Sequence, residues 1–188
     1  MFQQLLIAAR LLLMVSLVTG VAYPLAVTAI AQVLFPRQAN GSLLYVDDQA
    51  VGSELIGQNF SRDDYFWGRP SATSGTPYNG SASSGSNYGP LHPSLAESVE
   101  ARMKKLALSD EVSRQVPVDL VTSSGSGLDP HISPAAARFQ IARVAKARKM
   151  APQQLEQLID NNLEDRSLGI LGEPRVNVLK LNLLLDQQ

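Results

Sequence analysis

The sequence predicts an α+β fold in which one N-terminal transmembrane helix precedes a single mixed α/β extracytoplasmic domain. Residues 11–35 carry no charge, and the rest of the 188-residue chain has the length of one domain. Its apolar residues recur at helical spacing in some segments and alternate in others, which favours the α+β class. We therefore expect residues 1–10 in the cytoplasm, 11–35 in the membrane and 36–188 as a periplasmic soluble domain.

The uncharged run 11–35 is the clearest signal in the sequence. As a helix it would be about 37 Å long at about 1.5 Å per residue, which exceeds the roughly 30 Å hydrocarbon core of a bilayer. Arg10 stands before the run and favours an N-inside orientation. Pro24, close behind Gly20, predicts a kink, and a partner helix could satisfy the backbone groups that a kink frees. The alternative is a signal peptide cleaved after the small-x-small run 29–31.

Residues 42–46 and 54–60 are expected to form short strands or strand-like turns, separated by the turn residues 47–48 and 52–53. The segment 65–70 contains three aromatics, including the single tryptophan, Trp67, which either packs in the core or anchors a partner. Residues 70–96 carry no charge and are rich in Ser and Gly. This composition allows either a flexible linker or an ordered surface loop with many backbone hydrogen bonds.

The second half of the chain predicts three helices and two strands. Ser133 is suited to cap a helix that has Pro134 at its first position, where the missing N–H of proline costs nothing. In other segments apolar residues alternate, which is typical of strands. The expected elements are a helix at 95–106, a strand at 116–122, a loop at 123–131, a helix from Pro134 to about Met150, a helix from Pro152 to about Leu163 and a strand at 175–185.

Composition and motifs argue against several classes of function. The net charge of -1 provides no field that would attract nucleic acid. There is no cysteine, and His92 and His131 lack the spacing of a metal-ligand pair, so we expect no metal site. Neither a phosphate-binding GxxxxGK[ST] motif nor a GxSxG or SxxK nucleophile motif is present. Ser126, Asp129 and His131 have the residue types of a hydrolase triad, but a turn is the better interpretation, and we expect no catalytic residue.

Several runs resemble one family, in the same order along the chain. The run 119–137 (DLVTSSGSGLDPHISPAAA) is the most specific of them. The others are GVAYP at 20–24, GQNF at 57–60, YFWGRPS at 65–71, SGSNYGP at 84–90 and RVNVLKLN at 175–182. On these runs the chain resembles the C subunit of the Kdp-type potassium-transporting ATPases, the KdpC family.

The resemblance implies a non-catalytic accessory subunit of an ATP-driven K+ import complex in the bacterial inner membrane. The implied partners are a K+-channel-like A subunit and a P-type ATPase B subunit, and ATP and K+ are handled by the complex. The implied role is to assist assembly and to raise the ATP affinity of the B subunit. We expect partner contacts at Gly20, Pro24, Trp67, Tyr88, Ser126, Asp129 and His131.

The resemblance also implies a nucleotide contact at Gln140, with Arg143 beside it. The predicted topology places a bilayer between these residues and cytoplasmic ATP, so an indirect effect on ATP affinity is the physically simpler hypothesis. Two other classes stay open. An exported soluble binding protein would be recovered from the periplasm after signal cleavage, and an anchored serine hydrolase would lose its activity on Ser126→Ala substitution.

Overall fold

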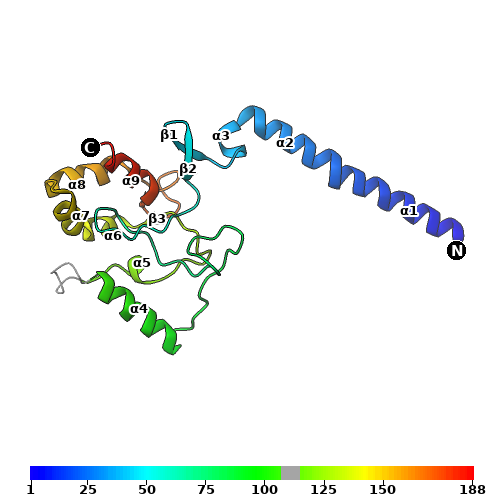
Figure 1. Ribbon diagram of the computed structural model, residues 1–188. Helices are drawn as coiled ribbons and strands as arrows, with labels where there is room; N and C mark the ends of the chain where they lie inside the picture. The colour runs from blue at the N-terminus through cyan, green and yellow to red at the C-terminus, as the bar shows by residue number, and fades with distance from the viewer. Residues whose placement is uncertain (107–114) are drawn as a thin grey trace. The chain divides into compact units, whose positions relative to one another are not determined.

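The apolar N-terminus is helical along almost its whole length in the computed structural model, which describes residues 1–106 and 115–188. Helix α1 (Phe2–Leu17), the π-helical turn η1 (Val18–Ala22) and helix α2 (Tyr23–Leu34) follow one another without a break, as the blue segment of Figure 1 shows. None of their residues is buried, and by length and composition the stretch can cross a membrane. It begins well before residue 11, the predicted start of the span.

The π-helical turn lies where the sequence predicts a kink. Proline has no backbone N–H, so Pro24 cannot bond to the helical turn before it. The N–H of Tyr23 donates instead to the carbonyl of Val18, five residues back, which is π-helical geometry. The irregularity at Pro24 therefore takes the form of one π-helical turn within a continuous helix (Figure 1).

The chain divides into two units, Met1–Ala50 and Val51–Gln188. In the first, α2 is followed by the short helix α3 (Pro36–Ala39) and by strand β1 (Leu43–Val46), which confirms the strand predicted at 42–46 except for its first residue. Strand β1 pairs with β2 (Gln49–Ser53).

Of the two interpretations of 54–60, the strand is wrong and the turn is confirmed at the start of the segment. Asp47 and Asp48 adopt positive φ angles of 49° and 61°, as in a two-residue hairpin turn, so the second strand starts at once, at Gln49. Residues 54–60 contain a turn and irregular backbone instead.

The second unit contains a small antiparallel sheet with the order β3-β5-β4. Its strands are β3 (His131–Ile132), β5 (Arg175–Asn177) and β4 (Leu163–Glu164). Val176 of the central strand lies opposite Ile132 on one side and Leu163 on the other. The buried apolar cluster gathers residues from both halves of the unit: Phe66, Trp67, Leu106, Leu120, Ile132, Ala136, Ala137, Val144, Ala145, Leu155, Ile159, Val176, Val178, Leu181 and Leu185.

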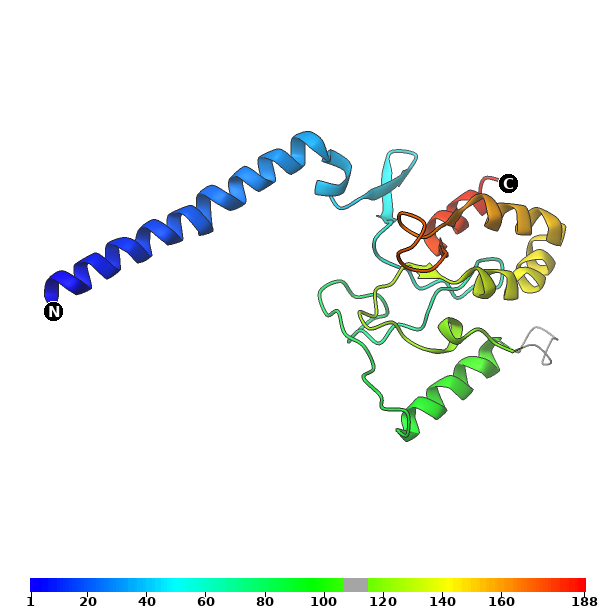
Figure 2. The same ribbon diagram turned by 180° about the vertical axis from the view of Figure 1, so that it is seen from behind.

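Six helices accompany this sheet in the described part of the unit. Figure 2 shows α6 to α9 grouped beside the sheet, in yellow to red, with α4 in green apart from them. Their bounds are α4 (Pro93–Leu106), α5 (Val118–Val121), α6 (Pro134–Phe139), α7 (Ile141–Arg148), α8 (Pro152–Asn161) and α9 (Val178–Leu185). The helices predicted at 95–106 and from Pro152 are confirmed.

The helix predicted from Pro134 to about Met150 is confirmed at its start and corrected in its middle. The Ser133 hydroxyl accepts a hydrogen bond from the N–H of Ala136 at 3.0 Å, so it is the predicted cap. At Gln140 the helix changes direction and restarts as α7. This break aims the Gln140 side chain at Trp67, as described below.

The strand predicted at 116–122 is wrong, because this segment forms the single helical turn α5. Of its residues, Leu120 alone is fully buried, whereas Val118 is exposed, so the alternating pattern does not correspond to a buried strand face. Asp119 on the same turn accepts hydrogen bonds from the N–H and the hydroxyl of Ser133. The turn therefore connects the core to the start of α6.

The strand predicted at 175–185 is correct only for β5. The Asn177 side chain accepts a hydrogen bond from the N–H of Lys180 at 3.1 Å and thereby caps helix α9. The leucine-rich run after Asn177 then buries Leu181 and Leu185 on one helical face. Alternating and helical spacing are both compatible with so apolar a run, and the cap decides between them.

Candidate functional site

Two buried side-chain amides hold the backbone of Phe66 and Trp67. Asn182 accepts from the N–H of Phe66 at 2.9 Å and donates to its carbonyl at 3.0 Å. Gln140 accepts from the N–H of Trp67 at 2.8 Å and donates to its carbonyl at 3.1 Å. The amides thus replace the hydrogen bonds that a neighbouring strand would supply. A segment with no strand partner is in this way fixed in the core.

Gln140 is 2% exposed, and both of its polar atoms are bonded within the protein. Its oxygen also accepts from Nη2 of Arg143 at 2.6 Å, and its nitrogen also donates to the carbonyl of Ala136 at 3.2 Å. A ligand could reach this amide only if these bonds broke. The structure therefore gives Gln140 a structural role, and a nucleotide contact at Gln140 stays a prediction.

Arg143 fills the space between the Trp67 ring and the chain before it. Its guanidinium stacks on the Trp67 ring at 4.1 Å from the centroid and donates to the carbonyls of Asp63 at 2.6 Å and Tyr65 at 3.0 Å. Burial lowers the pKa of Arg143 to about 10. Trp67 itself is buried, which agrees with the core-packing interpretation.

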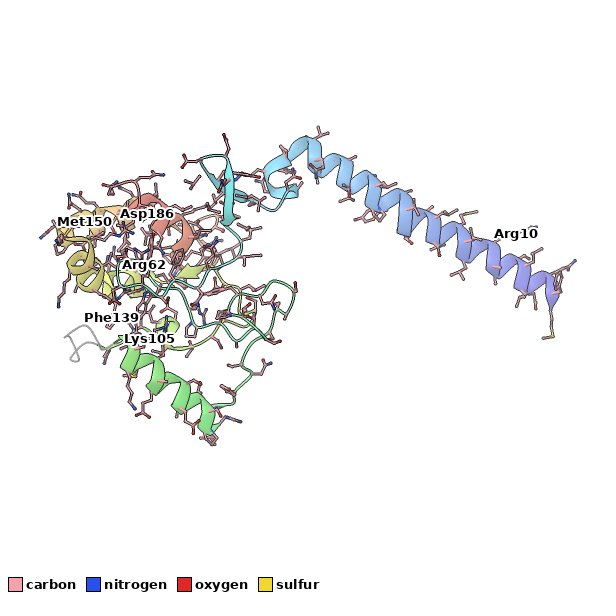
Figure 3. All side chains as sticks on the ribbon, viewed as in Figure 1. Arg10, Arg62, Lys105, Phe139, Met150 and Asp186 are labelled. Carbon is pink, nitrogen blue, oxygen red and sulfur yellow. The ribbon has the colours of Figure 1, made fainter. Side chains whose placement is uncertain are left out.

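A pocket of about 430 Å³ opens beside Trp67. The ammonium of Lys105, at the end of α4 (Figure 3), lies 5.4 Å from the ring centroid. Several cations border the pocket, and such a site attracts anions. The lining residues are Ser61, Asp63, Trp67, Lys105, Arg143, Lys146 and Ala147. Of the two predicted nucleotide residues, Arg143 lines the pocket, whereas Gln140, to which it is hydrogen-bonded, does not.

The Ser/Gly-rich segment 70–90 is an ordered loop that lies on the loop 123–131. We name the two together the loop platform. Of the two interpretations of its composition, the surface loop with many hydrogen bonds is confirmed. The bonds between the two segments run from Ser71 Oγ to the carbonyl of Gly127 (2.7 Å), from the N–H of Ser84 to the carbonyl of Ser126 (3.0 Å), from Ser83 Oγ to the same carbonyl (3.0 Å) and between the hydroxyls of Ser123 and Ser86 (3.0 Å).

Glycine is required where the two loops touch. Gly127 has a φ of +69°, and a Cβ there would lie 2.6 Å from the carbonyl oxygen of Ser84. A Cβ on Gly85 would lie 2.9 Å from the carbonyl oxygen of Gly125. A Cβ on Gly125, in contrast, would meet nothing within 4 Å. Close backbone approach thus explains the glycines at these two positions, 85 and 127.

A row of ionisable side chains runs from the platform across the sheet. Arg69 Nη1 lies 3.2 Å from Asp129, and Asp129 lies 3.3 Å from Nδ1 of His131. Nε2 of His131 lies 3.5 Å from Glu164, which also pairs with Arg175 at 3.0 Å. A groove of about 590 Å³ beside this row is lined in part by Arg69, Asp129 and His131, so these groups can be reached from outside.

The Asp129 carboxyl is ionised among these side chains. Burial by itself would raise the pKa of Asp129, but hydrogen bonds from His131 and the nearby charge of Arg69 outweigh it. The pKa of Asp129 is therefore lower than its ordinary value of 3.8.

Ser126, Asp129 and His131 do not assemble as a hydrolase triad. The Ser126 hydroxyl accepts from the N–H of Leu128 at 3.1 Å and lies 3.5 Å from Ser124 Oγ. The imidazole of His131 faces Asp129 and Glu164 instead. No hydrogen bond between Ser126 and His131 is found among the described residues, so the serine has no base to activate it.

The predicted partner contacts fall into three groups. Gly20 and Pro24 are exposed on the apolar helix, and Trp67 is buried in the core. The platform contains Ser126, Asp129, His131 and the exposed Tyr88, which stacks on His92 with ring centroids 4.8 Å apart. Among residues 1–106 and 115–188, no group of three or more His, Asp or Glu is arranged to hold a metal ion.

Sequence reasoning missed Asn182, Arg69 and Arg102. Arg102 donates from α4 to the carbonyls of Leu120 at 2.9 Å and Gly68 at 2.9 Å, so it ties the helix to the Trp67 segment. Asn182 could have been found from its position, because it is a polar amide inside a leucine-rich run. An amide that is buried in such a run must find hydrogen-bond partners.

Comparison with known proteins decides the family. The family model described as "KdpC: K+-transporting ATPase, c chain" matches residues 5–187. The potassium-transporting ATPase KdpC subunit of Polynucleobacter asymbioticus is 57% identical over 177 residues, which cover 94% of each chain. The KdpC subunit of Herpetosiphon aurantiacus is 58% identical over 181 residues, covering 96% of this chain and 94% of the relative. That of Burkholderia vietnamiensis is 59% identical over 172 residues, covering 91% and 89%.

The chain belongs to the KdpC family. As a KdpC subunit it is part of the K+-transporting ATPase complex. The family match includes the apolar helix as well as the whole second unit. A KdpC subunit with one N-terminal apolar helix is expected to associate with a membrane.

Proposed function

We propose that this KdpC chain is a non-catalytic accessory subunit that assists assembly of the K+ import complex and raises the ATP affinity of the B subunit. In this proposal 11–35 spans the bacterial inner membrane once, 1–10 is cytoplasmic and 36–188 is periplasmic. The observation that carries the proposal is the apolar helix Phe2–Leu34, of which no part is buried. So long an apolar surface requires lipid or partner helices around it.

We place the A subunit against this helix near Gly20 and Pro24. Small residues let two helices approach closely in a membrane, and a Cβ on Gly20 would meet nothing within 4 Å, so the position is open to a neighbour. The π-helical turn before Pro24 also leaves backbone groups that a partner helix can satisfy. A lone anchor in lipid would gain nothing from these features.

The loop platform is proposed to sit over the ion entrance of the A subunit, with Tyr88, Ser126, Asp129 and His131 as contacts. Residues 70–96 carry no charge, so the loop neither repels K+ nor binds it tightly. Hydrogen bonds between the two loops keep the surface in one conformation, and a preordered surface loses less entropy on docking.

The effect on ATP affinity is proposed to be indirect. The burial of Gln140 and its four hydrogen bonds favour a structural role for this residue. In the proposed topology the bilayer also separates it from cytoplasmic ATP. Contact with the A and B subunits would instead favour the conformation of the B subunit that binds ATP.

A direct nucleotide contact is the second candidate function, because the positive charges of Arg143 and Lys105 border a pocket and would attract the phosphates of a nucleotide. It predicts that the detergent-solubilised chain alone binds ATP, and that Lys105→Gln weakens this binding at least about fivefold. Equilibrium binding of fluorescent ATP to the purified chain decides between the candidates. The indirect mechanism requires that no saturable binding is seen.

Copurification tests the main proposal. Gly20→Leu or Pro24→Leu in a tagged chain should reduce recovery of the other subunits from detergent extracts, because each adds bulk where a partner helix packs. Val33→Leu, on the opposite face of the same helix, is the matched control and should leave recovery unchanged. Normal assembly and K+ transport in both variants would contradict the proposed helix contact.

A further inference from the structure

The turn between β4 and β5 displays aliphatic side chains to the solvent. Leu168 is 89% exposed, Ile170 75% and Leu171 57%. Contiguous exposed apolar residues on a folded domain mark sites of protein or membrane interaction. We name residues 168–171 the aliphatic tip. The family runs identified in the sequence leave this segment out, and the loop platform does not include it.

The aliphatic tip has a defined shape. Ser167 and Leu171 exchange two backbone hydrogen bonds of 2.9 Å, and the N–H of Gly169 donates to the carbonyl of Arg166 at 3.1 Å. Below the tip, Arg166 pairs with Glu173 at 2.6 Å. These bonds close the turn, so the three aliphatic side chains are presented on a fixed backbone.

Leu168 has a φ of +56°, a conformation that favours Gly or Asn over leucine. The leucine therefore adds strain, and its side chain gains little packing within the chain because it is almost fully exposed. A leucine that is strained and almost fully exposed in the free domain is a candidate for a contact outside it.

The charges around the tip distinguish a protein partner from a lipid surface. Arg166 pairs with Glu173, and Arg175 pairs with Glu164, so the cations of this hairpin are neutralised locally. Binding to anionic lipid requires cations available to the headgroups, and interfacial anchors commonly include Trp or Tyr, which residues 165–174 lack. Asp165 adds an exposed carboxylate to the same turn, so the charged residues around the aliphatic centre have no excess of cations. An aliphatic centre with such a rim matches a protein surface with an apolar pocket.

We propose that the aliphatic tip docks into an apolar pocket on another subunit of the K+-transporting ATPase complex, with Leu168 as its central contact. The proposal rests on the assembly role stated above and adds a further contact to those of the membrane helix and the loop platform. A side chain that fills a pocket at the centre of an interface dominates the binding energy, while the paired charges around it exclude water.

Leu168→Asn distinguishes a loss of docking from a loss of folding. The substitution should weaken association with the other subunits while it preserves or raises the stability of the free chain. Asparagine tolerates positive φ, so the melting temperature of the free, detergent-solubilised chain should stay constant or rise. Association with the other subunits, measured by binding the tagged chain to complex purified without it, should weaken at least about tenfold. Leu55→Asn, at a 58% exposed leucine outside the loop platform and the aliphatic tip, is the matched control and should bind less than about threefold more weakly.

Photo-crosslinking identifies the occupant. With benzoyl-phenylalanine in place of Leu168 in the intact, membrane-embedded complex, irradiation should join this chain to one other subunit. An adduct with a second copy of the chain, or with lipid alone, would overturn the proposal, as would unchanged association of Leu168→Asn. In each of these cases the tagged wild-type chain would still recover the complex. Failure of the assembly role itself is distinguishable, because the wild-type chain would then recover no other subunit.

Discussion

Replacing Gln140 by leucine tests whether this residue is structural. Leucine has a similar size but no hydrogen-bonding group, so it fills the site without replacing the bonds to Trp67 and Arg143. The backbone N–H and carbonyl of Trp67 would lose these partners inside the core. Arg143 would keep its bonds to the carbonyls of Asp63 and Tyr65 but lose its short bond to the amide.

The expected loss of stability follows from these groups. A buried backbone group left without a partner costs about 1 to 3 kcal/mol, and a bond to a charged group contributes about 1.5 to 3 kcal/mol. Leucine recovers part of this by its own burial. We therefore expect Gln140→Leu to lower the free energy of unfolding by about 3 to 5 kcal/mol. For a unit of this size that lowers the melting temperature by roughly 10 to 20 °C.

Fluorescence of Trp67 provides the assay, because it is the single tryptophan of the chain and lies at the perturbed contact. Thermal unfolding of the detergent-solubilised full chain would be followed for wild type, Gln140→Leu and the control Gln157→Leu. Gln157 is exposed on α8, and its replacement should change the free energy of unfolding by less than about 0.5 kcal/mol.

A Gln140→Leu variant that melts with the wild-type midpoint would refute the structural role. If that variant also lost ATP binding that the wild-type chain possesses, Gln140 would be a nucleotide contact, and the indirect mechanism proposed above would be wrong.

Three further predictions concern the platform and its surroundings. Gly127→Ala should destabilise the chain by about 2 kcal/mol or more, since its Cβ would meet the carbonyl of Ser84, whereas Gly125→Ala should change stability little; urea unfolding of the two variants compares them. Burial raises the pKa of Tyr78 to about 12. The contribution of Tyr78 to the free energy of unfolding is therefore complete below pH 10, the ordinary value, and is lost as the pH rises toward 12. The corresponding ionisation step should be missing from the alkaline absorbance titration of Tyr78→Phe. The depressed pKa of Asp129 gives stability that is present above pH 3.8 and lost as the pH falls through the folded-state value, so Asp129→Asn should show a smaller loss of unfolding free energy on acidification, measured by urea unfolding at about pH 5 and about pH 3.

The sequence predicts helices more reliably than strands in this chain. Helix α4 and the starts of α6 and α8 follow from apolar spacing, a serine cap and prolines at first helical positions. The segments 116–122 and 175–185 were misassigned because their alternation of apolar residues does not correspond to burial. Their secondary structure depends on contacts that spacing does not show. In the first segment a single leucine is buried, and in the second the Asn177 side chain caps a helix.

The site could be predicted in its loops but not in its core. The Ser/Gly composition indicated a loop with many hydrogen bonds, yet which serine pairs with which carbonyl depends on close backbone approach at Gly85 and Gly127. Only the family resemblance singles out Gln140 as a candidate site residue. Its partner Trp67 lies 73 positions away in the sequence, and no local pattern links residues at such a separation.

The location of the domain is the central claim, and cysteine labelling tests it most directly. The chain contains no cysteine, so Gln157→Cys on the exposed surface of α8 and Gln3→Cys at the N-terminus introduce single reactive groups. With a maleimide that does not cross the inner membrane, Gln157→Cys should react in intact cells and Gln3→Cys only after lysis, with both variants in the membrane fraction. Protection of Gln157→Cys until lysis, or recovery of the chain in the soluble fraction, would contradict the account.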